Sequence, residues 1–527
     1  MVAGFSAHAQ QAPATAGQTE NPKQPVSFDL FELRVKGNSV LDKQTIERAV
    51  YPFLGKQKSL DIVEQARSAL ENLYHAKGYQ TIAVDIPEQN VVNGVVYLQV
   101  AEGKVSRLRV TESRYFSLGA IKSKVPELAE GNVPNMPVMQ QQLTALIKES
   151  PDRSITPVLR AGDTPGTLEV DLKVKDELPL HGKFEINGRN TSSTDRLRAI
   201  ATLHYDNLWQ KNHSASLMYQ TSPENFNQVD VVVGSYVMPF LDTDKRLAFF
   251  AVNSSSNSVS NAGALSVVGA GSIYGLRFVN PIITPIQNLT QTFTAGVSYK
   301  NFKQDLNGAG IGLLFQKTPI SYLPFLLGYS GTLKLDDSQL GLNLNANFAF
   351  RNVGSNEAEF DNSRYLAKSD YAYLNGGLSY NHNLPYGMEF VSRLNGQIAD
   401  SPLIPNEQFS IGGMQSVRGY YETSVLADNG LQTSLEMYTP RMNVQDWPEY
   451  NKVRVLVFVD AGKGWIKDAL SGSPSQYDLA SAGTGFRLNL WKSITANFDV
   501  AVPFVSQLQS RVERGNPRLH FQIFTEF

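Results

Sequence analysis

Arg418 and Asp460 are the two ionisable residues whose surroundings most clearly suggest a chemical role. Asp460 lies in the stretch 453–461, where apolar residues alternate with others, so its carboxylate falls on the polar face of an expected strand. A carboxylate held away from bulk water needs a partner, because burying an unpaired charge is costly. The guanidinium of Arg418, which precedes Gly419 in a long Gly-containing connection, can bind a carboxylate through two parallel hydrogen bonds. A guanidinium such as that of Arg418 can therefore serve as the partner that Asp460 needs.

No other group of residues has the spacing of an active site. The sequence has no cysteine, no nucleotide-binding loop, no His cluster at metal-ligand spacing and no motif that places Ser, His and an acid together. The 7 histidines are dispersed, and His204 and His520 fall at strand positions where polar groups are more common than ligands. We expect no enzyme activity, no cofactor and no metal site.

Composition narrows the class of protein. The chain has 527 residues, of which 47 are basic and 49 acidic, so no net field favours nucleic acid. No apolar run reaches the ~18 residues of a membrane-spanning helix. The small residues of Ala7-His8-Ala9 suit a cleavage site, so residues 1–9 are interpreted as the end of a signal peptide. The polar residues 10–27 are expected to form a flexible N-terminal segment.

Residues 28–104 and 105–177 each follow the order strand, helix, helix, strand, strand, which predicts two copies of one α+β module. In the first module Asp42 suits a helix N-cap, and the helical spacing of the second helix ends at Gly78. In the second module the expected elements are a strand over 108–110, helices near 118–128 and over 139–147, and strands over 155–159 and 168–174.

Residues 178–527 lose the helical period and consist of alternating apolar and polar segments. In the stretch 340–350, Leu and Phe lie on one face and Asn on the other. A soluble sandwich shares this period, with its apolar face turned inward. About 16 segments at a mean spacing of ~22 residues instead favour a membrane barrel, which has an even number of strands. We predict a mainly β fold with α+β modules, in which a 16-stranded antiparallel transmembrane β-barrel follows the two modules.

The connection that contains Arg418 and the strand that contains Asp460 resemble two motifs of one superfamily. They are similar to the VRGY/F loop motif and the F-x-D-x-G strand motif of the outer-membrane protein assembly and transport superfamily. With two modules rather than five, and with the tract 35–41, the chain resembles the two-partner secretion transporter branch (TpsB type), whose modules are POTRA domains. The matching residues are Gly412, Gly413, Val417, Arg418, Gly419 and Tyr420 in the loop, and Phe458, Asp460 and Gly462 in the strand.

The resemblance implies that Arg418 and Asp460 meet in the pore. They would form a latch that fixes the folded-in loop to the barrel wall, with Gly419 allowing close backbone approach and Tyr420 packing nearby. The alternative is a static brace without a role in transport, since buried ion pairs often serve geometry alone.

The resemblance also implies a function. POTRA domains in the periplasm would capture an unfolded TpsA-type exoprotein bearing an N-terminal secretion domain, and the barrel would pass it across the outer membrane of a Gram-negative bacterium without ATP. A haemolysin, an adhesin, a haem-binding protein and a contact-dependent growth-inhibition toxin remain open as cargo. Other expected partners are outer-membrane lipid and the barrel assembly machinery, for which the terminal Phe527 resembles the recognition signal. Many relatives have a plug helix before the first module, but residues 10–27 show little helical amphipathicity, so plug and linker both stay open.

The second module offers candidates for partner binding. Met139, Leu143 and Ile147 follow helical spacing and are either a docking face or, as such spacing favours, the core of the module. One rival function is a barrel-protein assembly factor, against which the presence of only two modules argues. The other is a passive diffusion pore, which would leave residues 28–177 unexplained.

Overall fold

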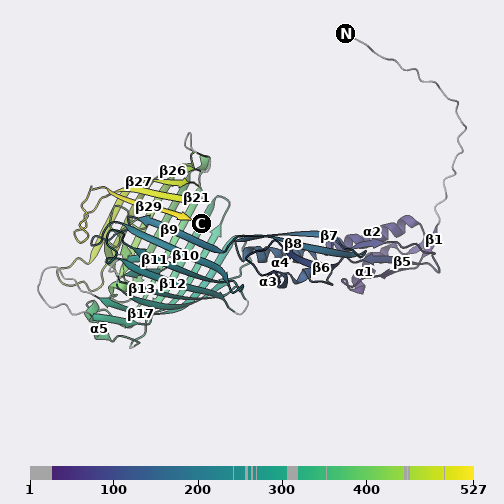
Figure 1. Cartoon of the computed structure of the whole chain (residues 1–527), viewed down its shortest axis with the longest axis horizontal. Coiled ribbons are helices and arrows are strands. Elements are labelled where there is room, and N and C mark those ends of the chain that lie inside the picture. The colour runs from purple at the N-terminus through teal and green to yellow at the C-terminus, as the bar shows by residue number, and fades with distance from the viewer. Residues whose placement is uncertain are drawn as a thin grey trace, which may run out of the picture. The chain divides into compact units, whose positions relative to one another are not determined.

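The computed structural model describes residues 27–527 except 241–242, 256–258, 263–264, 269, 305–317, 352, 444–447, 449–450 and 492. The predicted signal-peptide end (1–9) and nearly all of the flexible segment (10–27) lie outside the described residues. The chain divides into two compact units with the boundary between Glu177 and Leu178 (Figure 1). Among the described residues, no helix has the length and apolar character needed to cross a membrane.

The first module of the N-terminal unit is built on a three-stranded sheet in the order β2-β5-β4, in which β2 and β5 are parallel. Asp42 caps α1 by accepting the Thr45 N–H at 2.8 Å, and α2 buries Leu70 and Tyr74 in the module core. The pair β1–β3 was not predicted, because β3 lacks apolar alternation. The elements are β1 (Phe28–Leu30), β2 (Glu32–Lys36), α1 (Lys43–Val50), η1 (Tyr51–Phe53), β3 (Gly55–Lys58), α2 (Leu60–Ala76), β4 (Ala83–Asp85) and β5 (Val95–Ala101).

The second module repeats this plan with the sheet order β6-β8-β7, in which β6 and β8 are parallel. The helix expected over 118–128 is split, because Pro126 cannot supply an N–H to continue it. Asn135, the N-cap of α4, also donates a hydrogen bond to the Lys77 carbonyl at 2.9 Å and so joins the two modules. The elements are β6 (Lys104–Thr111), α3 (Leu118–Ser123), η2 (Pro126–Leu128), α4 (Met136–Lys148), β7 (Arg153–Ala161) and β8 (Thr167–Asp176).

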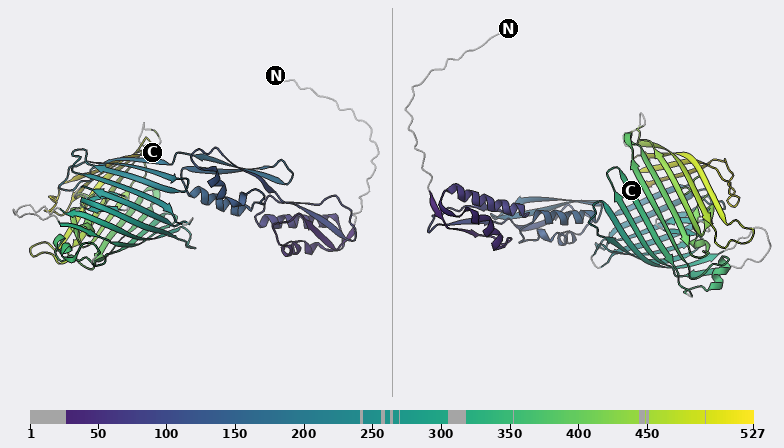
Figure 2. Two further views of the ribbon diagram at one scale, coloured as in Figure 1. Left: turned by 60° about the horizontal axis from the view of Figure 1, so that its bottom comes forward. Right: turned by 180° about the vertical axis from the view of Figure 1, so that it is seen from behind.

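The C-terminal unit is a closed antiparallel barrel in which β29 pairs with β9 (Figures 1 and 2). Strands β18 and β19 both pair with β17 and form one interrupted strand, so the predicted 16-stranded barrel is confirmed. The wall strands are β9 (Leu180–Asn187), β10 (Arg198–Leu208), β11 (His213–Thr221), β12 (Asp230–Pro239), β13 (Arg246–Ser254), β16 (Ala270–Ile282), β17 (Leu289–Gln304), β18 (Thr318–Tyr322), β19 (Phe325–Lys334), β20 (Ser338–Phe348), β21 (Ala372–Asn383), β22 (Glu389–Ala399), β25 (Asn429–Tyr438), β26 (Lys452–Trp465), β27 (Gln476–Leu490), β28 (Ile494–Pro503) and β29 (Arg518–Glu526).

The two faces of the wall differ as the strand alternation predicts. On β26, Val457 and Val459 are more than half exposed, whereas Asp460 beside them is completely buried. On β20, Leu344 is likewise exposed on the outer face. Apolar side chains therefore cover the outside and polar ones point into the lumen, which is the reverse of a soluble sandwich.

Connections are short at one end of the barrel and long at the other, and one long connection, 400–428, folds back into the lumen. It contains η4 (Pro405–Glu407) and a hairpin of β23 (Phe409–Ile411) and β24 (Val425–Ala427). The other elements at this end are β14 (Val259–Ala262), β15 (Leu265–Val268) and α5 (Glu357–Ser363), and η3 (Pro385–Gly387) lies in a short connection. We call residues 400–428 the lumen loop.

Candidate functional site

The tip of the lumen loop is tied to the barrel wall by the ion pair expected from the sequence. Arg418 Nε donates to Asp460 Oδ2 at 2.7 Å and Nη2 donates to Oδ1 at 2.8 Å, which is the two-bond geometry of a guanidinium on a carboxylate. The backbone N–H of Arg418 also donates to Oδ2 at 3.1 Å. Both side chains are buried, with 3% and 0% of their surface exposed.

Arg418 lies within a larger charge network. Its Nη1 is 2.8 Å from a Glu436 carboxylate oxygen on β25 and 3.6 Å from one of Asp499 on β28. Arg393 binds Glu436 and Arg487 binds Asp499, so three guanidinium groups face three carboxylates. The three buried carboxylates are therefore balanced by three guanidinium groups, of which Arg418 is buried and Arg393 is 42% exposed.

The ionisation and orientation of Arg418 have clear physical causes. Burial disfavours the charged guanidinium, and the hydrogen bonds of Asp460 together with the negative charges of Asp460, Glu436 and Asp499 favour it. The guanidinium carbon lies 3.4 Å from the centroid of the Phe458 ring, which is cation–π distance. Ser434 on β25 accepts a further hydrogen bond from Nη2 at 3.0 Å. Arg418 is thus held from the loop, the strand and the ring at once.

Glycines make room for this contact. Gly412 and Gly413 have φ of +105° and +114°, a region that other residues rarely adopt, and they form the turn that starts the loop tip. On β26 a Cβ at Gly462 would lie 2.6 Å from a methyl carbon of Ile411 and 3.0 Å from one of Val417. Gly462 therefore opens the wall to the apolar side of the loop.

Gly419 and Tyr420 follow the arginine and are also fixed by the wall. Gly419 has φ +92°, and its N–H donates to His520 Nε2 on β29 at 2.9 Å. The Tyr420 side chain is buried, and its hydroxyl lies 3.0 Å from the Ala480 carbonyl oxygen and 2.8 Å from that of Val505. The loop tip therefore contacts strands β25 to β29.

Several members of this site were not assigned to it from the sequence, among them Glu436, Asp499 and His520. Each is an inward-facing residue of an alternating strand. Alternation gives the face of a residue but not its height in the barrel or the identity of its cross-strand neighbours. His520 was interpreted only as a polar group, whereas it is 2% exposed and accepts a hydrogen bond from the loop backbone.

The partner-binding candidates on α4 differ in their surroundings. Met139 and Leu143 are each 5% exposed and belong to the core of the second module. Leu146 completes this buried face. Ile147 is 38% exposed, so the interpretation of Ile147 as a core residue was wrong. Phe527 exchanges two backbone hydrogen bonds of 3.0 Å with Gly182 on β9 and so helps to close the barrel.

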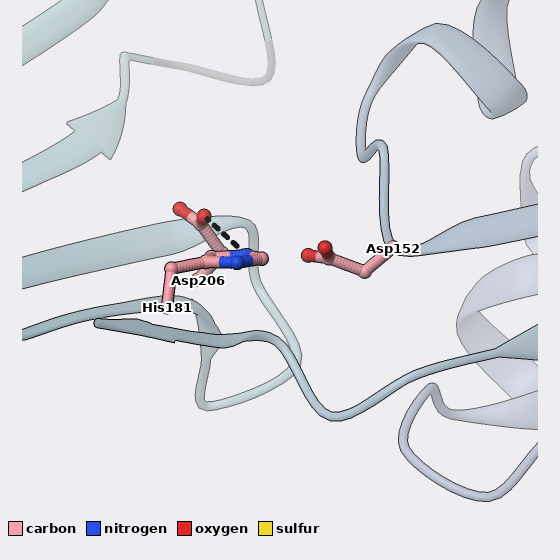
Figure 3. A group of neighbouring side chains, drawn as sticks. All are labelled: Asp152, His181 and Asp206. Carbon is pink, nitrogen blue, oxygen red and sulfur yellow. Dashed lines mark ion pairs between the residues drawn. The ribbon is translucent and has the colours of Figure 1, made fainter. Parts of the chain in front are cut away.

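Histidines that are dispersed in the sequence become neighbours on β9 and β10. His181 and His204 are cross-strand partners with ring centroids 6.4 Å apart. His204 Nε2 lies 2.9 Å from an Asp206 carboxylate oxygen. His181 Nε2 lies 3.9 Å from the other oxygen (Figure 3). Asp152, also drawn in Figure 3, belongs to the N-terminal unit. Within the barrel unit, the hydrogen bond between His204 and Asp206 accounts for the position of the Asp206 carboxylate.

Comparisons with known proteins agree with this architecture. The family model described as haemolysin secretion/activation protein ShlB/FhaC/HecB matches residues 166–488, and the model of the ShlB-type POTRA domain matches residues 28–103. The outer membrane transporter CdiB of Dickeya dadantii is 22% identical over 474 residues, which cover 86% of this chain and 78% of that protein. The heme/hemopexin transporter protein HuxB of Haemophilus influenzae is 22% identical over 524 residues, which cover 94% and 87%.

Solved structures show the same fold. CdiB from Escherichia coli aligns with a TM-score of 0.60 at 17% identity, covering 98% of this chain and 93% of that one. BamA from Haemophilus ducreyi lacking POTRA domains 1–3 aligns with a TM-score of 0.59 at 15% identity, covering 95% and 100%. Because the first family model spans more than half of the sequence, this chain belongs to the haemolysin secretion/activation protein family ShlB/FhaC/HecB, the TpsB-type transporters that reside in the outer membrane with POTRA domains in the periplasm.

Proposed function

We propose that this chain exports one partner exoprotein, which its POTRA domains capture in an unfolded state and its barrel passes outward without ATP. The observation that carries the proposal is the lumen loop, fixed inside the barrel by the buried pair of Arg418 and Asp460. A passive pore would need no capture modules, so residues 28–177 would be unexplained. We assign residues 28–104 and 105–177 to the two POTRA domains and residues 178–527 to the barrel.

Arg418 and Asp460 act in this proposal as a latch of the closed state. A buried ion pair contributes little net stability but defines one geometry, because desolvation offsets most of the Coulomb attraction. Such a contact holds the loop tip in place yet can be exchanged for hydration when an arriving polypeptide favours the open state. Gly412, Gly413, Val417, Gly419, Tyr420, Phe458 and Gly462 would shape the loop and strand for this contact.

Capture is assigned to the second POTRA domain. Its sheet has β6 and β7 as edge strands, and an extended polypeptide can add to such an edge through backbone hydrogen bonds, largely without regard to side chain. Ile147 is exposed on the adjacent helix α4 and is the better docking candidate, since Met139 and Leu143 are buried. Ile147→Ser should weaken exoprotein binding while the domain stays folded, whereas Met139→Ser should unfold it. Equal binding by Ile147→Ser and the parent would remove Ile147 from the docking surface.

Biogenesis requires further partners. The exposed outer face of the barrel fits outer-membrane lipid, and the terminal Phe527, 73% exposed, is assigned as the signal read by the barrel assembly machinery. Phe527→Ser should lower the amount of folded barrel in the membrane without changing the latch, and heat-dependent mobility on gels measures this amount.

The deciding experiment compares the spent medium and the outer-membrane proteome of the producing strain with and without this gene. Loss of one large secreted protein, with other barrels unchanged, would support a dedicated exporter and identify its cargo. Broad depletion of barrels would instead indicate an assembly factor, and an unchanged proteome would leave a diffusion pore.

A further inference from the structure

The base of the lumen loop makes a second buried ionic contact with the barrel wall. Glu407, at the end of η4, has 1% of its side chain exposed. Its Oε1 accepts from Lys300 Nζ on β17 at 2.5 Å and from the Tyr322 hydroxyl on β18 at 2.5 Å. Its Oε2 accepts from the Tyr373 hydroxyl on β21 at 2.8 Å. One loop carboxylate therefore joins three wall strands.

The surroundings of Glu407 are apolar, which makes these contacts important. Tyr322 and Tyr373 belong to a buried cluster that also contains Phe302 and the loop residues Leu403 and Ile404. A carboxylate cannot stay ionised in such surroundings without a cation and hydrogen-bond donors, and the three wall groups supply both. Lys300 keeps 20% of its side chain exposed, so water can reach the ammonium if the carboxylate leaves.

This contact is separate from the latch. Lys300, Tyr322 and Tyr373 lie on β17, β18 and β21, whereas the residues around Arg418 lie on β25, β26, β28 and β29. The two groups occupy different arcs of the wall, and one holds the base of the loop while the other holds its tip. Another buried carboxylate of the loop, Asp428, has partners outside this wall cluster. It accepts hydrogen bonds from the loop N–H of Leu403, and from the N–H of Lys467 and the guanidinium of Arg364 in other connections.

We propose that Glu407, Lys300, Tyr322 and Tyr373 form a base anchor, a second lock that must open together with the Arg418 latch before the lumen loop leaves the pore. Release of the latch alone frees the hairpin of β23 and β24 but leaves the loop base against β17, β18 and β21. Both locks must therefore open for a wide pore. This inference rests on the proposed export function, in which the lumen loop closes the pore.

The test uses the full-length chain, which contains no cysteine, so that one introduced thiol is unique. Ile404→Cys reports on the base and Val417→Cys on the tip, because both positions are buried, and a water-soluble maleimide reacts only after local release. Glu407→Gln should raise the labelling rate at position 404 by about tenfold or more, since it removes the charge of a buried ion pair, and leave position 417 within about twofold. Lys300→Met should reproduce this pattern from the wall side.

Control variants distinguish release of the loop base from a general loosening of the barrel. Asp468→Asn changes an exposed acid of a neighbouring connection at a positive φ that Asn tolerates, and should alter neither rate. Heat-dependent gel mobility selects the variants whose barrel is folded. In planar bilayers, Glu407→Gln combined with Arg418→Met should conduct more than either single variant.

Three results would overturn the base anchor: no change at position 404 in both wall and loop variants, equal acceleration at both positions, or a double variant that conducts no more than Arg418→Met alone. The labelling pattern does not depend on cargo. A chain that shows the pattern but exports nothing would sink the export function and leave the two separate anchors standing.

Discussion

Replacement of Arg418 by Met tests the latch most directly, because Met keeps much of the side-chain volume and removes the charge. The change leaves Asp460, Glu436 and Asp499 with only Arg393 and Arg487 to compensate them. Loss of one partner of a buried pair costs about 3–5 kcal/mol, because a carboxylate is then buried without compensation. If that cost falls on the closed state, the equilibrium between bound and released loop tip shifts by about 10²- to 4 × 10³-fold.

The assay is maleimide labelling of the Val417→Cys chain in vesicles, with and without Arg418→Met. Val417 is completely buried, so the labelling rate follows the fraction of chains whose tip has left the wall. Lys463→Met, on strand β26 with Asp460, is the matched control. It removes an ion pair with Asp478 at 3.2 Å in which both side chains are at least 40% exposed, and such a pair contributes at most about 1 kcal/mol.

One result would refute this reasoning. If folded Arg418→Met chains label at the rate of the Lys463→Met control, the ion pair does not hold the tip. The apolar contacts of the loop hairpin, in which Ile411 and Tyr420 are buried, would then hold the tip without it. Measuring export by the same variants distinguishes a latch from a static brace. Faster labelling with unchanged export would make the ion pair a static brace.

Three smaller predictions follow from the same structure. Gly419→Ala places a Cβ at φ +92° and should favour the released loop by roughly 1–2 kcal/mol, seen as faster labelling at position 417. His520→Leu leaves the Gly419 N–H without its acceptor at a cost of about 1–3 kcal/mol, whereas His520→Gln, which can still accept, should stay closer to the parent in tip labelling. The hydrogen bond from Arg109 lowers the pKa of Asp171 below its usual value. This contact therefore stabilises the second POTRA domain above pH ~4, and the stabilisation is lost as pH falls through the lowered pKa. Hydrogen exchange of β8 should differ between the parent and Asp171→Asn at pH 7 and should not differ in strong acid.

Much of the barrel could be predicted from the sequence because the side chains of every wall strand follow the same alternating pattern. Side chains alternate between lipid and lumen, so Val457 and Val459 on one face assign Asp460 to the other. The same rule cannot show that Lys300 and Tyr373, separated by many residues and two intervening wall strands, converge on one carboxylate of the lumen loop. That convergence depends on barrel closure and on the path of a loop that has no periodic pattern.

The helices of the two modules could also be predicted from a periodic pattern, and those predictions were wrong where local packing departs from the pattern. Spacing identified α4 and its buried Met139 and Leu143, but a helix of 3.6 residues per turn drifts, so the next buried position is Leu146 and not Ile147. The helix breaks at Pro126 because proline has no backbone N–H to donate. The apolar spacing over 118–128 does not reveal this local effect. Tertiary packing decided these details.

The charge balance of the latch predicts how two changes combine. Arg418→Met leaves one carboxylate in excess, but the double variant with Asp460→Asn leaves two carboxylates facing Arg393 and Arg487. The buried excess charge is then gone, so the double variant should lie closer to the parent in tip labelling than Arg418→Met does. If the two single effects, expressed as free energies, add up to the effect of the double variant, the two residues act independently. Each residue would then hold the loop through its other contacts, since only a shared charge term makes the second loss repair the first.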